Sequence, residues 1–141
     1  MRAYVALMTL ALQLPGNHTP EGFLSIPWGT LSSQMREKYE LREISRDADR
    51  VMYSSSIRRL GNAELAECNL EFVRERFAGA VILTKGRGDS DELLQFLTAR
   101  FGAGQRVDHT AICWIAGDVH VSYDTDRYGD AYVYWYSLRH Q

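Results

Sequence analysis

The sequence contains little cysteine or proline, and it has neither a block of like charge nor a long apolar run. Its two cysteines, Cys68 and Cys113, exclude a disulfide-rich scaffold, and without spaced histidines they form no metal-binding signature. The 16 basic and 18 acidic residues are interspersed along 141 residues, with a net charge of -2. The basic stripe of nucleic-acid-binding proteins and the polybasic signal for anionic lipid are both missing. We therefore expect no nucleic-acid partner.

The N-terminal residues differ from the rest of the chain. Arg2 is followed by an uncharged apolar run, Ala3–Leu14, and then by Pro15-Gly16. This is the layout of a secretory signal, and the run is too short to span a bilayer. We expect residues 1–20 to be a leader that directs the protein to the periplasm or the medium, and residues 21–141 to form a single α+β domain. The alternative is a cytoplasmic protein whose N-terminal run is a buried strand or helix.

The two cysteines leave two interpretations open. Cys68 and Cys113 both lie inside apolar segments with the pattern of strands. In an exported protein they can form one disulfide. In a cytoplasmic protein they are two buried thiols.

The stretch Pro27-Trp28-Gly29-Thr30 has the chemistry of a turn that starts a helix. Proline fixes φ, glycine permits the turn, and threonine accepts amide hydrogen bonds. We expect Trp28 to pack beneath this turn; a loop in which Trp28 stacks on a ligand ring is the alternative. A helix is expected from Thr30 or Ser32 to about Tyr39, with apolar residues of one face at four-residue spacing: Leu31, Met35 and Tyr39.

Strand patterns follow this segment. Residues 48–56 predict a short strand, and the alternation that begins at Ala66 predicts a hairpin over 66–84 with its turn at Arg74-Glu75. Asp89 and Glu92 have capping-box spacing before a helix that Gly102 ends. The apolar face of that helix consists of Leu93, Leu94, Phe96, Leu97 and Phe101. Three more strands are expected over 109–117, 119–125 and 131–139.

Both halves of the chain show the same order, a helix and then three strands, which suggests a tandem αβββ repeat. Six antiparallel strands and two helices predict an α+β two-layer sandwich. In such a fold the helices cover one face of the sheet and the other face is left open to water.

The final strand carries the main candidate binding surface. Tyr132, Tyr134 and Tyr136 share one face, while small Ala131 and Val133 suit packing against a helix on the other. Tyrosines are favoured at recognition surfaces because they bury a large area with few rotamers. The alternative is that aromatic residues simply cover a sheet face. Two further binding candidates are Trp114 and His120.

Catalytic and metal-binding patterns are weak. His109 and His120 have acids nearby in sequence, Asp108, Asp118 and Asp124, but no known nucleophile or zinc motif is present. The run Asp124–Asp130 imitates the start of a calcium loop and lacks its bidentate glutamate. We therefore assign no catalytic residue, metal or cofactor. A small enzyme that uses His120 with nearby carboxylates remains the alternative hypothesis.

Several motifs together carry a resemblance. The opening F-x-x-I-x-W-G-T (Phe23, Ile26 and Trp28-Gly29-Thr30), with Trp114 in a later strand, resembles a group of small exported bacterial proteins of uncharacterised function. The resemblance covers about residues 22–138. The repeated order of elements is more remotely similar to the β-lactamase inhibitor protein and to the small lipoprotein of the outer-membrane β-barrel assembly machinery. These similarities imply protein binding rather than catalysis.

The sequence thus predicts an exported module that binds another protein or an envelope component through its open sheet face. A homodimeric structural subunit is a further alternative.

Overall fold

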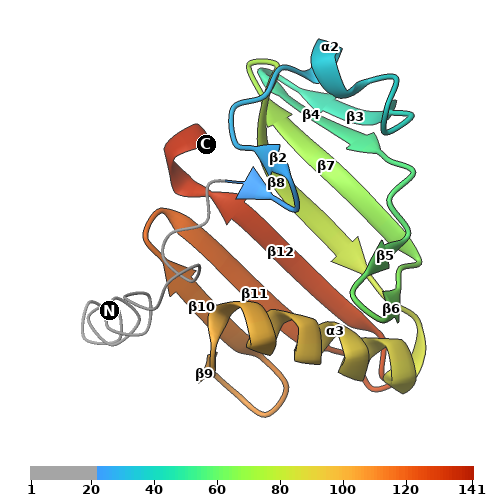
Figure 1. Ribbon diagram of the computed structural model, residues 1–141, viewed down its shortest axis with the longest axis vertical. Helices are drawn as coiled ribbons and strands as arrows, with labels where there is room; N and C mark the ends of the chain where they lie inside the picture. The colour runs from blue at the N-terminus through green and yellow to red at the C-terminus, as the bar shows by residue number, and fades with distance from the viewer. Residues whose placement is uncertain (1–21) are drawn as a thin grey trace.

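The computed structural model describes residues 22–141, which consist mainly of antiparallel strands (Figure 1). Eight of these strands form one sheet in the order β3–β4–β7–β8–β12–β11–β10–β9. Their bounds are β3 Arg42–Asp47, β4 Arg50–Ser54, β7 Glu67–Val73, β8 Arg76–Leu83, β9 Gln105–Arg106, β10 Ile112–Ala116, β11 Val119–Thr125 and β12 Ala131–Ser137.

Each half of the chain builds one half of this sheet. The first half supplies β3, β4, β7 and β8, and the second half supplies β9 to β12. The halves join where β8 pairs with β12, in a register that runs from Leu83 opposite Tyr132 to Gly79 opposite Tyr136. The centre of the sheet is therefore a pairing between segments far apart in sequence.

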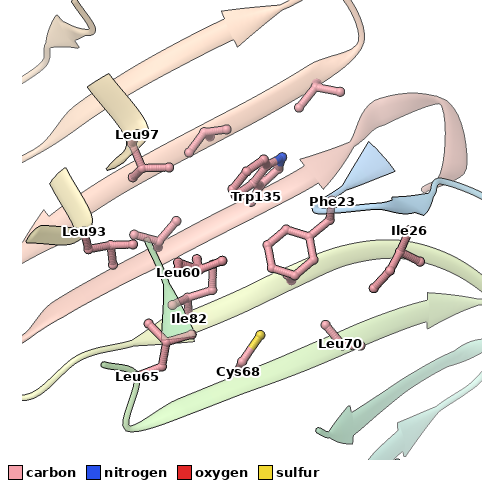
Figure 2. Packing of buried hydrophobic residues seen from close by; sticks show 14 of the residues in the cluster. Phe23, Ile26, Leu60, Leu65, Cys68, Leu70, Ile82, Leu93, Leu97 and Trp135 are labelled. Carbon is pink, nitrogen blue, oxygen red and sulfur yellow. The ribbon is translucent and has the colours of Figure 1, made fainter. Parts of the chain in front are cut away.

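One face of the sheet is covered, and the core lies there. Helix α3 (Gly86–Phe101) lies across this face together with the hairpins β1–β2 (Gly22–Phe23 and Ile26–Pro27) and β5–β6 (Arg59–Leu60 and Ala63–Glu64) (Figure 1). Trp135 of β12 lies among Phe23 and the α3 leucines Leu93 and Leu97, all buried (Figure 2). Strand alternation predicted that Ala131 and Val133 of β12 face the helix, and both are fully buried together with Trp135.

The predicted α+β sandwich of six strands and two helices is wrong. The fold is mostly β, with eight strands in the main sheet, two small hairpins and one long helix within residues 22–141. Helix α2 is a single turn, Ser32–Met35, and Glu40 adopts φ 50° before the chain enters β3. Strand β3 is exposed at every position, so it has no apolar alternation by which the sequence could reveal it.

The turn before α2 has the structural role that its chemistry predicted. Trp28 stacks on Phe77 with ring centroids 4.9 Å apart, and the Gly29 amide donates to the Phe77 carbonyl. The Thr30 hydroxyl donates to the Pro27 carbonyl at 2.7 Å. Thr30 therefore closes the turn on itself instead of capping the helix.

Helix α3 confirms its predicted end but not its predicted start. Gly102, at φ 85°, donates its amide to the Thr98 carbonyl and ends the helix. The helix begins at Gly86 rather than at Asp89, whose carboxylate instead accepts the Glu64 amide of β6 at 3.0 Å. The capping box is therefore replaced by a contact that holds β5–β6 against the helix.

The expected leader, residues 1–20, lies outside the described residues. Within the part of the chain that the structure describes, no helix is long and apolar enough to cross a membrane.

Candidate functional site

The face of the sheet opposite α3 carries the three tyrosines of β12. We call it the tyrosine face. Tyr132 lies between Leu83 and Asp124, Tyr134 between Val81 and Ser122, and Tyr136 between Gly79 and His120. Side chains of the flanking strands complete the tyrosine face: Met52 of β4, Asn69 and Glu71 of β7, and Cys113 of β10.

The three tyrosines differ in how they are held. Tyr132 is 46% exposed, and its hydroxyl donates to Asp126 Oδ2 at 3.4 Å. Tyr134 and Tyr136 are partly buried and stack on each other, with ring centroids 4.4 Å apart and planes inclined by 27°. The sequence placed all three on one face, but the structure leaves only Tyr132 broadly accessible.

A nearly buried carboxylate anchors the middle of the tyrosine face. Glu71, whose side chain is 12% exposed, accepts the Tyr134 hydroxyl on Oε1 at 2.8 Å and Arg50 Nη1 on Oε2 at 3.0 Å. The same Arg50 nitrogen donates to Gln141 Oε1. Burial and the hydrogen bond to Glu71 raise the pKa of Tyr134, so its hydroxyl stays a donor at neutral pH.

Gly79 makes room for this arrangement. A Cβ at Gly79 would lie 3.0 Å from Tyr136 Cβ and 3.3 Å from Glu71 Oε1. Sequence reasoning assigned no role to Gly79, Arg50, Gln141 or Glu71. The available signal was a glycine inside a strand, which often marks the close approach of another group.

The acids near His120 in sequence are held by other residues. His120 Nδ1 lies 3.3 Å from the Tyr136 hydroxyl. Asp118 pairs with Arg139 at 2.8 Å, and Asp124 accepts the Thr110 hydroxyl at 2.6 Å.

The other acid and histidine considered for catalysis lie in an exposed turn. Asp108 Oδ1 accepts the amides of Thr110 and Ala111, and these bonds hold the pKa of Asp108 below its usual value. His109 is exposed in the same turn, where its backbone carbonyl accepts Arg106 Nη1. These hydrogen bonds shape the loop, and Asp108 and His109 line the same open hollow beside it.

Trp114 is not part of the tyrosine face, contrary to the sequence-based assignment. It is 1% exposed on the core side of β10 and donates Nε1–H to the Gly102 carbonyl at 2.8 Å. Strand alternation places Cys113 and Ile115 on the tyrosine-face side of β10 instead, and Ile115 is buried there.

The Cys68–Cys113 disulfide that the sequence left open does not form. Both thiols are free, with Cys68 buried on the core side of β7 and Cys113 on the tyrosine face of β10. Four strand-to-strand steps at about 4.8 Å each separate β7 from β10. A disulfide joins Cα atoms no more than about 7 Å apart, so this arrangement excludes a bridge within one chain.

The calcium-like segment is a closed turn. Asp126 Oδ1 accepts the amides of Tyr128 and Asp130, and the Asp130 carboxylate in turn accepts the Gly86 amide at 2.8 Å. Within residues 22–141, no group of three or more metal-ligating side chains comes together.

Comparison with known proteins found no matching family model, no matching curated protein and no matching solved structure.

Proposed function

We propose that this protein is a non-catalytic binding module that engages another protein through its tyrosine face. The observation that carries the proposal is Tyr132, a large side chain that is 46% exposed beside two tyrosines held in fixed positions. Interface hot spots are enriched in tyrosine, and they cluster where neighbouring groups exclude water.

The tyrosine face is pre-organised for binding. The stacked rings of Tyr134 and Tyr136, together with the Glu71–Tyr134 hydrogen bond, fix two side chains before any partner arrives. A partner therefore loses less conformational entropy on binding than it would on a surface of mobile side chains. Val81 and Leu83 of β8 provide apolar area beside the rings.

The charges around Tyr132 indicate the chemistry of the partner. Glu67, Asp124 and Asp126 lie at this end of the tyrosine face, and Glu67 and Asp124 are exposed. A partner surface with an apolar centre and a lysine or arginine at its rim complements this arrangement.

We further propose that the module acts in the periplasm or outside the cell. The apolar run Ala3–Leu14 after Arg2 and the resemblance to small exported proteins support export. The intact mass of the protein produced with its own N-terminus tests this proposal. Loss of roughly the first 20 residues supports export, and a full-length mass favours the cytoplasmic alternative.

Site-specific photo-crosslinking tests the binding proposal. A photoreactive phenylalanine analogue replaces Tyr132, and a control places it at Thr98, which is exposed on α3 on the other side of the sheet. We expect a crosslinked protein at position 132 that is absent at position 98. The identified protein is then purified, and Tyr132→Ala should weaken its binding about tenfold or more while the fold is retained.

Other outcomes reject the proposal. Equal crosslinking at both positions, or unchanged affinity of the Tyr132→Ala variant, contradicts a binding tyrosine face. Crosslinking to a second copy, with a dimeric solution mass, replaces the proposal with the homodimer.

A further inference from the structure

Arg100 has a guanidinium group without a polar partner among residues 22–141. It lies in the last turn of α3, 5.6 Å from the ring centroid of Trp135 and 5.8 Å from that of Phe101. Its Nε is completely buried and has no hydrogen-bond acceptor. Within residues 22–141 it is the only charged side chain with such an orphaned buried atom; the other two orphans are indole nitrogens.

This lack of a partner is unusual because most buried donors are satisfied. An unsatisfied buried donor costs about 1–3 kcal/mol, and more when the group is charged. Stacking on aromatic rings compensates for part of the charge of Arg100 but provides no acceptor for its N–H groups. Arg50 illustrates the ordinary arrangement, since it binds both Glu71 and Gln141.

Arg100 also lines a pocket. The pocket has a volume of about 200 Å³ and lies between the end of α3 and the β1–β2 hairpin, which occupy the same side of the sheet (Figure 1). Its other lining residues belong to the hairpin: Gly22, Leu24, Ser25, Ile26 and Pro27. Among the described residues that line the pocket, Arg100 is the only charged one, and Ser25 is exposed and offers a hydroxyl donor.

The chemistry of the lining selects an anion with a short apolar body. A guanidinium presents a planar fork of donors that matches the two oxygens of a carboxylate. Leu24 and Pro27, which are exposed, supply apolar walls for the rest of the ligand. A volume of about 200 Å³ is smaller than the roughly 300–1,000 Å³ of pockets for drug-sized ligands, so the part of the ligand that it holds is small.

We propose that Arg100 and the β1–β2 hairpin form a binding site for the carboxylate end of a small monocarboxylate. The carboxylate accepts hydrogen bonds from the Arg100 guanidinium, and the apolar body of the ligand lies against Leu24 and Pro27. The carboxylate can belong to a free short-chain acid or to the C-terminus of a peptide. The site lies on the side of the sheet opposite the tyrosine face, so it is independent of the function proposed above.

Nuclear magnetic resonance of the arginine side chains tests this site directly. The ¹⁵N-labelled full chain is titrated with sodium butyrate, with sodium chloride at equal ionic strength as the control. We expect the Arg100 Nε–Hε signal to shift saturably with butyrate only. A parallel titration compares a tripeptide that has a free C-terminal carboxylate with its amide, which separates the two sources of the carboxylate.

Substitutions locate the site. Arg100→Gln should abolish the saturable shifts of the hairpin amides, and Arg100→Lys, which keeps the charge and loses the fork, should weaken binding about tenfold. Arg139→Gln removes an exposed charge elsewhere and should leave butyrate binding unchanged. Ser25→Ala retains Arg100 and should weaken binding several-fold, so the test does not depend on the folding of the Arg100 variants.

Three results overturn the proposal. The first is that butyrate and chloride give equal, non-saturating shifts. The second is that Arg139→Gln weakens binding as much as Arg100→Gln does, which indicates general charge screening. The third concerns Glu21, which directly precedes Gly22 in sequence. In this result, Glu21→Gln moves the Arg100 signal without any added ligand, and butyrate binds to this variant but not to the unaltered chain. The acceptor for Arg100 is then the carboxylate of Glu21.

Discussion

Glu71 and Gly79 together set the shape of the tyrosine face at the scale of single residues. Glu71 holds Tyr134 and Arg50 at once, and Gly79 leaves the space into which the Glu71 carboxylate and the two stacked rings fit. A carboxylate that is only 12% exposed needs both partners, because removing either one leaves part of a buried charge unsatisfied.

Gly79→Ala should therefore destabilise the fold by about 1–3 kcal/mol, since its Cβ would lie 3.0 Å from Tyr136 Cβ. Gly88→Ala is the matched control. Gly88 lies in α3, and no neighbouring segment comes within 4 Å of the position that a methyl group would take there. Alanine at this position should be neutral or stabilise by up to about 1 kcal/mol. Urea unfolding of both variants measures the difference, and equal effects would contradict the packing described for the tyrosine face.

Cys68 is a single residue that makes the stability of the fold depend on pH. Burial raises the pKa of its thiol from 9.0 to about 12, so the folded state favours the protonated form. The resulting stability is complete below about pH 9 and is lost as the pH rises toward 12, at about 1.4 kcal/mol per pH unit. Between pH 8 and pH 10.5, the free energy of unfolding measured with urea should fall less for Cys68→Ala than for the unaltered chain. Equal losses would mean that the Cys68 thiol does not control this titration.

At the scale of elements, strand alternation decides which thiol a reagent reaches. Cys68 points into the core from β7, and Cys113 lies on the tyrosine face of β10, where it is partly exposed. Iodoacetamide at pH 8 should alkylate Cys113 in the folded protein and Cys68 only after denaturation. Peptide mass spectrometry assigns the sites, and rapid labelling of Cys68 in the folded protein would show that the register of β7 is wrong.

Local signals predicted some elements well and missed others for identifiable reasons. The end of α3 and the turn at Arg74-Glu75 follow from glycine at a helix end and from a break in alternation, and both are present. Strand β3 was missed because edge strands are often charged. Helix α2 was overestimated because Tyr39, at helix spacing from Met35, packs against the core from the turn that follows the helix. At the candidate site, the tyrosines of β12 were found by period-two alternation, whereas Trp114 was assigned to the wrong face.

At the scale of the whole molecule, the β8–β12 pairing makes the two halves of the sheet one structure. Native-state hydrogen exchange should therefore give the highest and mutually similar protection to β8 and β12, and the lowest to the edge strands β3 and β9. Very different opening free energies for β8 and β12 would indicate two independently unfolding halves.

The sequence by itself determined the features that depend on neighbours along the chain. Among these are the end of α3 at Gly102, the turn at Gly117-Asp118 and the alternation that buries Trp135 and exposes Tyr132. Helix caps, turn conformations and strand periodicity are local, so a short stretch of residues is enough to encode them.

Only the tertiary structure decided which segments meet. It paired β8 with β12, brought Glu71 to Tyr134 and placed the two cysteines on opposite faces of the sheet. It also left Arg100, beside the β1–β2 hairpin, without a polar partner among residues 22–141. These relations join residues that are distant in sequence, and the free energy of closing such loops and burying such surfaces belongs to the whole fold rather than to any single segment.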